Sequence, residues 1–330
     1  MKKIFLFAAA AMVSLSSCVQ TQEVYTGDVH EMGFKSAVTR GIVQTNDDMV
    51  YPLAVSAVWD STDDSTANFG VYFDGAKFVY DEGTSLWKGE PARYWPTSGD
   101  MHFLAFSPFP SVATLTTTYK ADGTIEKMDV IGINNNIKNQ HDVLYSDLLS
   151  VEAPQTAAQS LQFHHALAQI NVTFKKTDSA AAVVLNSVKL LNAYFTGDVC
   201  IVPAEGAKST ASWTQLGLKT NSFFLEADAT GVEDGVLDQV LVSDSAYAPI
   251  PQVVMPSDQT AFEIIYTIDG HQHTYIHDCT LDAHEAPIVP TPKWEMGYKY
   301  TYNFTINVNE IIFDCEVENW IPAEGGTITI

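Results

Sequence analysis

Positively charged residues are scarce in this sequence. Lys and Arg together number 17 against 40 Asp and Glu, so the formal net charge is −23, and only Arg40 and Arg93 are arginines. Nucleic-acid binding depends on clustered cations that neutralise phosphates. The composition therefore excludes nucleic acid as an expected partner and favours a soluble protein of the cell exterior.

The sequence also lacks the motifs that build common catalytic and phosphate-binding sites. It contains no G-x-S-x-G nucleophile motif and no glycine-rich phosphate loop. His164 and His165 are adjacent, and adjacent side chains on a strand point to opposite faces. We therefore expect one histidine to be buried and hydrogen-bonded and the other to be exposed, with no enzymatic activity and no cofactor.

The apolar run near the start, residues 4–13, is too short to span a bilayer, which takes about 20 apolar residues. Lys2 and Lys3 precede it, as in an export signal. The segment Leu15-Ser16-Ser17-Cys18 resembles a bacterial lipobox, in which the cysteine becomes the first mature residue and is acylated. We expect residues 1–17 to be a lipoprotein signal peptide and Cys18 to carry the lipid anchor. An ordinary cleavage site that contains cysteine is the alternative.

Cysteine is too rare to build a disulfide framework. The sequence has four cysteines, and with Cys18 assigned to lipidation three remain, namely Cys200, Cys279 and Cys315. An odd number cannot all pair internally. One disulfide with one buried thiol, or three buried thiols, are both compatible with the sequence.

Strand patterns dominate the remainder, and no long helical pattern is present. Residues 298–308 alternate cleanly between aromatic or aliphatic and polar side chains, and residues 262–268 do the same. Asp74-Gly75 lies between two short apolar runs and predicts a hairpin turn. Residues 196–250 are predicted to be rich in turns. Short strands at regular spacing indicate an all-β sandwich fold.

The alternation changes phase within residues 161–174, near the middle of the chain. Leu161, Phe163 and Leu167 share one parity, and the apolar positions from Ile170 onward share the other. A shift of one residue moves side chains to the opposite face, so this strand must bulge, bend or change sheet. A short helix is the alternative. We predict two domains, 41–168 and 169–330, after a tether of residues 18–40.

His271, His273, His277 and Cys279 resemble a set of metal ligands, since imidazole and thiolate bind zinc. They share one parity, so a strand would project all four from one face. At about 3.3 Å per residue the set extends over roughly 26 Å, which is too far for one ion. We therefore expect no metal site, with His271 and His273 as a weak candidate pair.

Several segments together resemble the fimbrillin family. They occur in its order, after a lipobox: Tyr94-Trp95-Pro96 before residues 101–108, Asp142-Val143-Leu144-Tyr145, residues 163–170 (FHHALAQI), Val253-Val254-Met255-Pro256, residues 294–300 (WEMGYKY) and the late Trp320. The resemblance implies two tandem transthyretin-like β-sandwich domains. It also implies an outer-membrane lipoprotein precursor of type V pili (fimbriae) of Bacteroides-type bacteria, displayed on the cell surface.

The same resemblance implies how such a subunit assembles. In the family an arginine-specific protease cuts at a place corresponding to Arg40-Gly41, which would remove residues 34–38 as a strand and open a groove for a strand of another subunit. The implied partners are other pilus subunits, the membrane through the lipid, and a host protein or glycan. A surface glycan-binding lipoprotein outside any fibre is the alternative function.

Four Asp-Ser sequences resemble the O-glycosylation acceptor used in such bacteria. The serines concerned are Ser61, Ser65, Ser179 and Ser245. Asp-Ser is also good turn chemistry, which is the alternative explanation for each of them.

Overall fold

The structure is a computed structural model, and it describes residues 30–36, 51–61, 69–111, 113–135, 140–177, 181–225, 239–242, 245–282, 285–307 and 311–320. Cys18, Arg40, Gly41, Ser65 and Ser179 lie outside these ranges. Every regular element in the described ranges is a β-strand, which confirms the predicted all-β class. This part of the chain contains no helix of the length and apolarity that a membrane span requires.

The first sandwich is built on a nine-stranded sheet. Its hydrogen-bonded order is β10 (Gln159–Leu161), β1 (Gly33–Ser36), β4 (Leu86–Gly89), β3 (Gly70–Asp81), β2 (Leu53–Asp60), β5 (Asp100–Ser107), β8 (Leu144–Ser146) and β11 (Phe163–His165), with β9 (Leu149–Glu152) also on β5. β10 and β11 stand at opposite ends of this order, yet only Gln162 separates them in sequence. The sheet must therefore curl until its two ends approach each other.

The concave side of this curled sheet encloses one apolar core. Phe34, Phe78, Phe103 and Phe163, from four different strands, are all fully buried in it. β2 is buried along both faces because a second sheet covers its other side. That sheet has the order β15 (Thr210–Leu216), β14 (Thr196–Val202), β7 (Ile125–Asn134) and β6 (Thr114–Tyr119).

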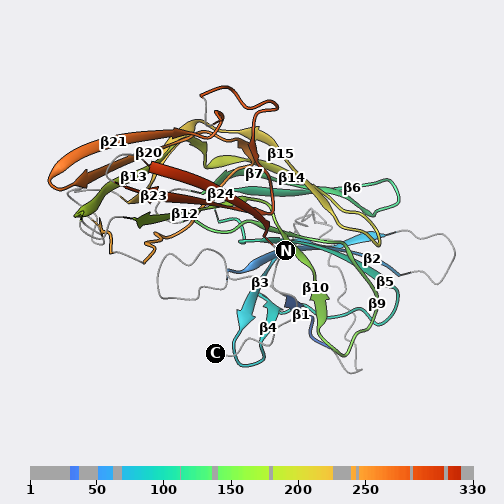
Figure 1. The fold of residues 1–330 in the computed structure, drawn as a ribbon. Coiled ribbons are helices and arrows are strands. Elements are labelled where there is room, and N and C mark those ends of the chain that lie inside the picture. Colours follow the sequence, from blue (N-terminus) through green and yellow to red (C-terminus); the bar gives the residue numbers. More distant parts are fainter. Residues whose placement is uncertain are drawn as a thin grey trace, which may run out of the picture.

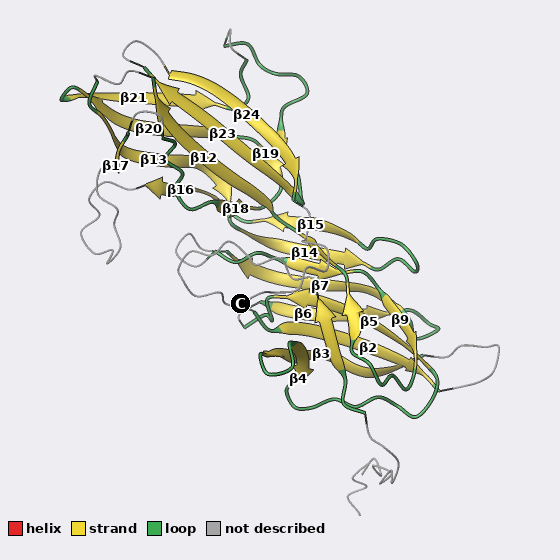
Figure 2. Cartoon of the chain, turned by 60° about the horizontal axis from the view of Figure 1, so that its bottom comes forward, coloured by secondary structure: helices red, strands yellow, loops and turns green. Residues whose placement is uncertain are grey.

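The second sandwich packs two further sheets face to face. One has the order β18 (Gln252–Val254), β12 (Ala168–Lys176), β23 (Tyr298–Ile306) and β24 (Ile311–Asn319); the other has β16 (Lys219–Leu225), β13 (Val183–Tyr194), β20 (Ala261–Ile268) and β21 (His271–Asp278), with β17 (Gln239–Val240) on β13. Phe174, Phe262 and Phe304 fill the space between them. β19 (Ser257–Asp258) and β22 (Lys293–Trp294) form a small separate ladder. Figure 2 shows the two sandwiches arranged end to end.

The phase change in the middle of the chain marks a change of sheet, which is one of the three outcomes predicted for it. β11 ends at His165 in the first sandwich, and β12 begins at Ala168 in the second. The chain then returns, because β14 hydrogen-bonds to β7. β14 and β15 therefore belong to the first sandwich although they follow residue 168. Together with β7 they lie between the nine-stranded sheet and the second sandwich (Figure 1).

Two local predictions are wrong. Asp74-Gly75 forms no hairpin; it is a bulge within the continuous strand β3, where the register against β2 shifts between Val55 and Ala57. Gly75 has φ +54°, and its N–H donates to the hydroxyl of Ser56, which stabilises the bulge. The region 196–250 is also less irregular than predicted, because β14, β15 and β16 lie in it. β14 keeps its period-2 burial pattern, while its register against β15 shifts between Asp198 and Val199.

The turn before β5 depends on glycine. Gly99 has φ +95°, and a Cβ added there would lie 2.0 Å from the carbonyl oxygen of Asp60. We expect Gly99→Ala to lower the free energy of unfolding by at least about 1–2 kcal/mol, because an L side chain is strained at this φ and also clashes. Chemical denaturation measures the loss. Gly70→Ala, with open space around it, is the matched control; equal stability of the two variants would contradict the account.

Candidate functional site

β1 lies between two strands of the first sandwich. It pairs antiparallel with β4 and parallel with β10, so that Phe34 lies opposite both Trp87 and Gln159. The Phe34 side chain is fully buried, and its ring centroid lies 5.2 Å from those of Phe78 and Phe103. The segment is thus an internal strand that completes both the hydrogen bonding and the core.

The residues just before β1 are tied to the sandwich as well. The Met32 N–H donates to the Arg93 carbonyl at 2.7 Å, and the Trp95 N–H donates to the His30 carbonyl at 3.0 Å. Glu31 and Tyr94 form a β-bridge between these bonds. The sequence prediction placed a strand at residues 34–38; the structure has it at Gly33–Ser36, and residues 37–41 lie outside the described ranges.

His165 forms a buried pair with Asp142. Its Nδ1 lies 2.5 Å from Asp142 Oδ2, and both side chains are almost completely inaccessible to solvent. Burial raises the pKa of Asp142, while the charge and hydrogen bond of His165 oppose that rise. The imidazole also stacks on the indole of Trp320, with ring centroids 3.8 Å apart and planes inclined by 11°.

This pair lies where the chain passes from one sandwich to the other. The Ala166 N–H donates to the Val143 carbonyl, and the Trp213 indole N–H donates to the Ala166 carbonyl, each at 2.7 Å. The Gly297 N–H donates to the Leu167 carbonyl, and the Trp320 N–H donates to the Gly297 carbonyl. Three other segments of the chain thus hold the two residues that connect β11 to β12, and Trp320 is bonded to one of these segments.

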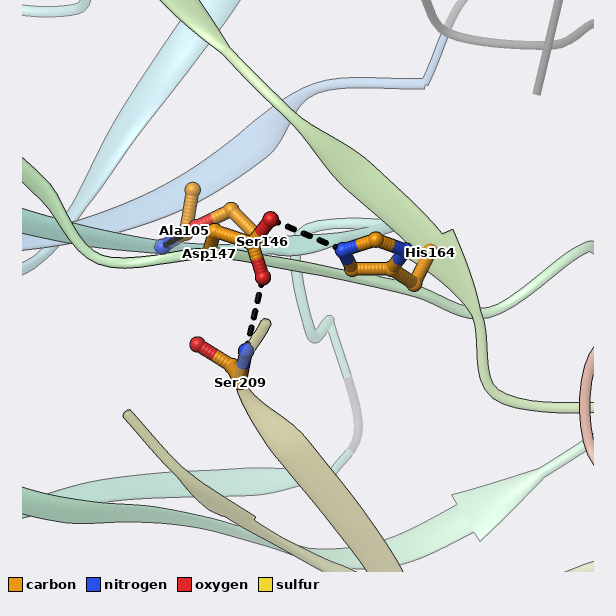
Figure 3. Close-up of polar contacts among 5 residues, drawn as sticks. All are labelled: Ala105, Ser146, Asp147, His164 and Ser209. Carbon is orange, nitrogen blue, oxygen red and sulfur yellow. Dashed lines mark hydrogen bonds and ion pairs between the residues drawn. The ribbon is translucent and has the colours of Figure 1, made fainter. Parts of the chain in front are cut away.

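His164 points to the opposite face, as predicted, but it is not freely exposed. Its Nε2 lies 2.9 Å from Asp147 Oδ2, and the other Asp147 oxygen accepts the backbone N–H of Ser209 at 2.7 Å (Figure 3). The side chain of His164 is only 18 % exposed because it packs in this contact. Asp147 lies between the histidine and the serine, and Ser209 contributes its backbone N–H. These bonds connect the β14–β15 loop to the end of β8. They do not form a catalytic triad, because in a triad the histidine lies between the acid and the serine.

The other candidate residues lie apart from these contacts. Ser61 and Ser245 are exposed, and so are His271 and His273 on β21. Within the described ranges no three His, Cys, Asp or Glu residues are grouped to hold a metal ion. Cys200, Cys279 and Cys315 are all free thiols, and only Cys279 is buried, so the structure has neither a disulfide nor three buried thiols.

The fimbrillin-like family model matches residues 39–320. The chain belongs to the fimbrillin-like family. The family is one of structural fimbrial subunits, and membership indicates a pilus-type subunit of the cell surface. None of the curated proteins matches this sequence.

Solved structures of fimbrial proteins are similar to this fimbrillin-like chain. A fimbrial protein from Bacteroides vulgatus is 17 % identical with a TM-score of 0.52, covering 88 % of this chain and 99 % of its own. The tip fimbrial protein Mfa3 from Porphyromonas gingivalis, with a C-terminal truncation, is 10 % identical at a TM-score of 0.42, covering 88 % and 99 %. A fimbrial assembly protein from Parabacteroides distasonis is 13 % identical at 0.38, covering 88 % and 98 %. The first of these supports the fold.

The segments that carry the fimbrillin resemblance meet at the two sites described above. Tyr94 and Trp95 pair with the residues before β1, and Asp142, His165 and Trp320 meet at the junction. Sequence reasoning missed the pairing of His165 with Asp142 and of His164 with Asp147. Its only signal was two acids and two histidines in nearby strands, and strand pairing had to bring them together.

The buried pair is expected to stabilise the junction strongly. Asp142→Ala should lower the free energy of unfolding by about 3–5 kcal/mol, because it leaves a buried imidazole without its carboxylate. Asp147→Ala is the control: its pair with His164 is partly exposed, and the expected loss is about 1 kcal/mol. Equal losses in urea denaturation would contradict the assignment of His165 as the structural histidine of the junction.

His277 gives the second sandwich a pH dependence. Its ring lies 3.7 Å from that of Phe313, and burial lowers its pKa from 6.5 to about 4. Between those pH values the unfolded chain binds a proton that the folded protein does not, so stability falls as the pH is lowered from 6.5 to 4. We expect His277→Phe to lose less stability over this window. Denaturation at pH 7.5 and 4.5 tests this, and equal losses in both proteins would contradict it.

Proposed function

We propose that the protein is the precursor of a structural, adhesive subunit of type V pili that assembles by strand addition. The observation that carries this proposal is the position of β1. It is a short strand near the start of the described chain, yet it lies inside a sheet, between β4 and β10, with a fully buried aromatic side chain.

Removal of β1 would leave a groove one strand wide. The edges of β4 and β10 would then present unpaired N–H and C=O groups, which are a template for another strand. The floor of the groove would be the apolar core surface that Phe34 covers, which includes Phe78, Trp87, Phe103 and Leu161. Burying one large apolar side chain there contributes about 1.5–3 kcal/mol, in addition to the main-chain hydrogen bonds.

The pairing of β1 also indicates what kind of strand would replace it. A strand that runs in the same direction as β1 would be parallel to β10 and antiparallel to β4. Placing a large apolar residue at the Phe34 position sets the register, because a shift of one residue would turn that side chain to the opposite face of the sheet.

Arg40-Gly41 lies four residues beyond the end of β1, so cleavage there would place β1 in the released leader. β1 is held by three register pairs with β10 and two with β4, a small ladder that can exchange once its covalent link is cut. In this proposal Cys18 carries the lipid that delivers the precursor to the outer membrane. Ser61, Ser65, Ser179 and Ser245 remain proposed O-glycosylation acceptors.

The experiment is to follow assembly after treatment with an arginine-specific protease. The native precursor should yield subunits that begin at Gly41 and migrate as a ladder of polymers in unheated detergent gels. Arg40→Ala should remain a monomer, because β1 stays covalently attached and refills its own groove.

Arg93→Lys is the matched control, since it removes the other arginine of the chain. It should be cleaved and should polymerise like the native protein. Polymers formed by Arg40→Ala, or assembled subunits whose N-terminus is Cys18, would overturn the cleavage step.

A further inference from the structure

Three consecutive residues are buried where β1 begins. Met32 and Phe34 are fully inaccessible to solvent and belong to the apolar core of the curled sheet. Gly33 between them is buried as well, whereas Glu31 and Lys35 on either side are exposed. The first sandwich therefore encloses a triplet made of one large side chain, a residue without a side chain, and a second large side chain.

The two large side chains of this triplet are fixed in register by the main chain. Phe34 lies opposite Trp87 of β4, and the Met32 N–H donates to the Arg93 carbonyl at 2.7 Å. Residues two apart on a strand point to the same face, which here is the core face. A strand that takes the place of β1 in the same register has to supply two large apolar side chains, because a smaller one would leave a cavity in the core.

Gly33 faces the opposite side, where two neighbouring side chains leave little room. A Cβ added to it would lie 3.2 Å from Leu86 Cδ1, 3.8 Å from Leu86 Cβ and 3.9 Å from Ala158 Cβ. Alanine at this position requires the Leu86 methyl group to move by a few tenths of an ångström. A β-branched residue would add further carbon atoms in the same place, and overpacking of this kind is destabilising.

The reason for this glycine is space and not backbone conformation. Gly33 belongs to a β-strand and is not among the glycines with positive φ. Residues 295–299 (EMGYK) repeat residues 31–35 (EMGFK) with one aromatic residue exchanged. There, however, Gly297 has φ +79°, and the nearest atom to its added Cβ is the His165 carbonyl oxygen at 3.8 Å. Glycine is required by the backbone at residue 297 and by the enclosing side chains at residue 33.

We propose that the groove recognises three consecutive residues, so that the strand which replaces β1 has to carry a large apolar residue, a glycine and a second large apolar residue. This inference rests on the proposed function, in which a strand of another subunit fills the groove that β1 leaves. It adds the chemistry by which that strand is selected. Ordinary strands, which favour β-branched residues, are rejected when such a residue meets Leu86.

The requirement for glycine reverses the usual effect of this residue in a strand. Glycine weakens strands because it has the most conformational freedom to lose, whereas valine favours them. In a groove without the restriction at residue 33, replacing the glycine of the incoming strand by valine would strengthen binding. In the groove described here the same replacement weakens binding, so the direction of the change distinguishes the two cases.

The experiment uses the full precursor nicked at Arg40 by an arginine-specific protease, in the Arg93→Lys background, which has no other arginine. A fluorescent peptide of residues 30–36 (HEMGFKS) is added in excess to exchange with the leader, and fluorescence polarisation measures its uptake. Gly33→Val in the peptide should weaken uptake at least about tenfold through overpacking. Met32→Ala should weaken it at least about thirtyfold, because a core position is emptied.

Lys35→Val in the peptide is the matched control, since it places the same side chain two residues further along the same face, at an exposed position. Its uptake should equal that of the native peptide. Leu86→Ala in the subunit removes the side chain nearest to the added Cβ and should restore most of the uptake that the Gly33→Val peptide loses. Uptake of the native peptide by this variant verifies that it is folded.

Uptake of the Gly33→Val peptide that equals or exceeds that of the native peptide would overturn the triplet requirement and leave strand addition intact. So would a failure of Leu86→Ala to improve the uptake of that peptide. No uptake of the native peptide by a fully nicked precursor would instead overturn strand addition, and this inference with it. In the intact precursor, Gly33→Val should lower the midpoint of urea denaturation more than Lys35→Val does, and equal midpoints would contradict the packing at Gly33.

Discussion

The structure depends on the continuity of one short stretch of chain, residues 159–176. It supplies β10 and β11 to opposite ends of the first sheet and then β12 to the second sandwich. Because a single residue joins β10 to β11, the first sheet has to curl and enclose its own core. Because Ala166 and Leu167 join β11 to β12, the two sandwiches are also constrained at this point.

The polar contacts of the junction follow from that constraint. The backbone of Ala166 and Leu167 lies in the interior, so its N–H and C=O groups need partners other than water. Val143, Trp213 and Gly297 provide them. The buried pair of His165 with Asp142 lies beside these bonds, and the stack of Trp320 on the imidazole connects the end of β24 to the same place.

The N-terminal strand has the opposite character. β1 fills a gap in the curled sheet, but its ladder is short, so its attachment depends on Phe34, on the hydrogen bonds of residues 30–32 and on chain connectivity. A strongly held junction and an exchangeable strand are compatible requirements for a fibre subunit. In the assembly that we propose, the first would maintain the relative position of the sandwiches, and the second would offer a site at which a neighbour adds a strand.

Local pattern determined much of this protein. Period-2 alternation predicted the strands that became β20 and β23, and the phase change at residues 161–174 predicted a bulge, a bend or a change of sheet where the chain changes sheet. A bulge is not recognised by this reasoning: Asp74-Gly75 has the composition of a hairpin turn but lies inside the continuous strand β3. An Asp-Gly pair has the same composition in a hairpin turn and in a bulge, and the register of the neighbouring strand decides which of the two forms.

Only the tertiary structure decided which residues meet. The sequence separates Asp142 from His165, and both from Trp320, by distances that no local pattern can relate. Strand order brings them together, and it also brings β14 and β15 back to the first sandwich. Local periodicity reports which face of an element is buried; long-range pairing decides what lies against that face.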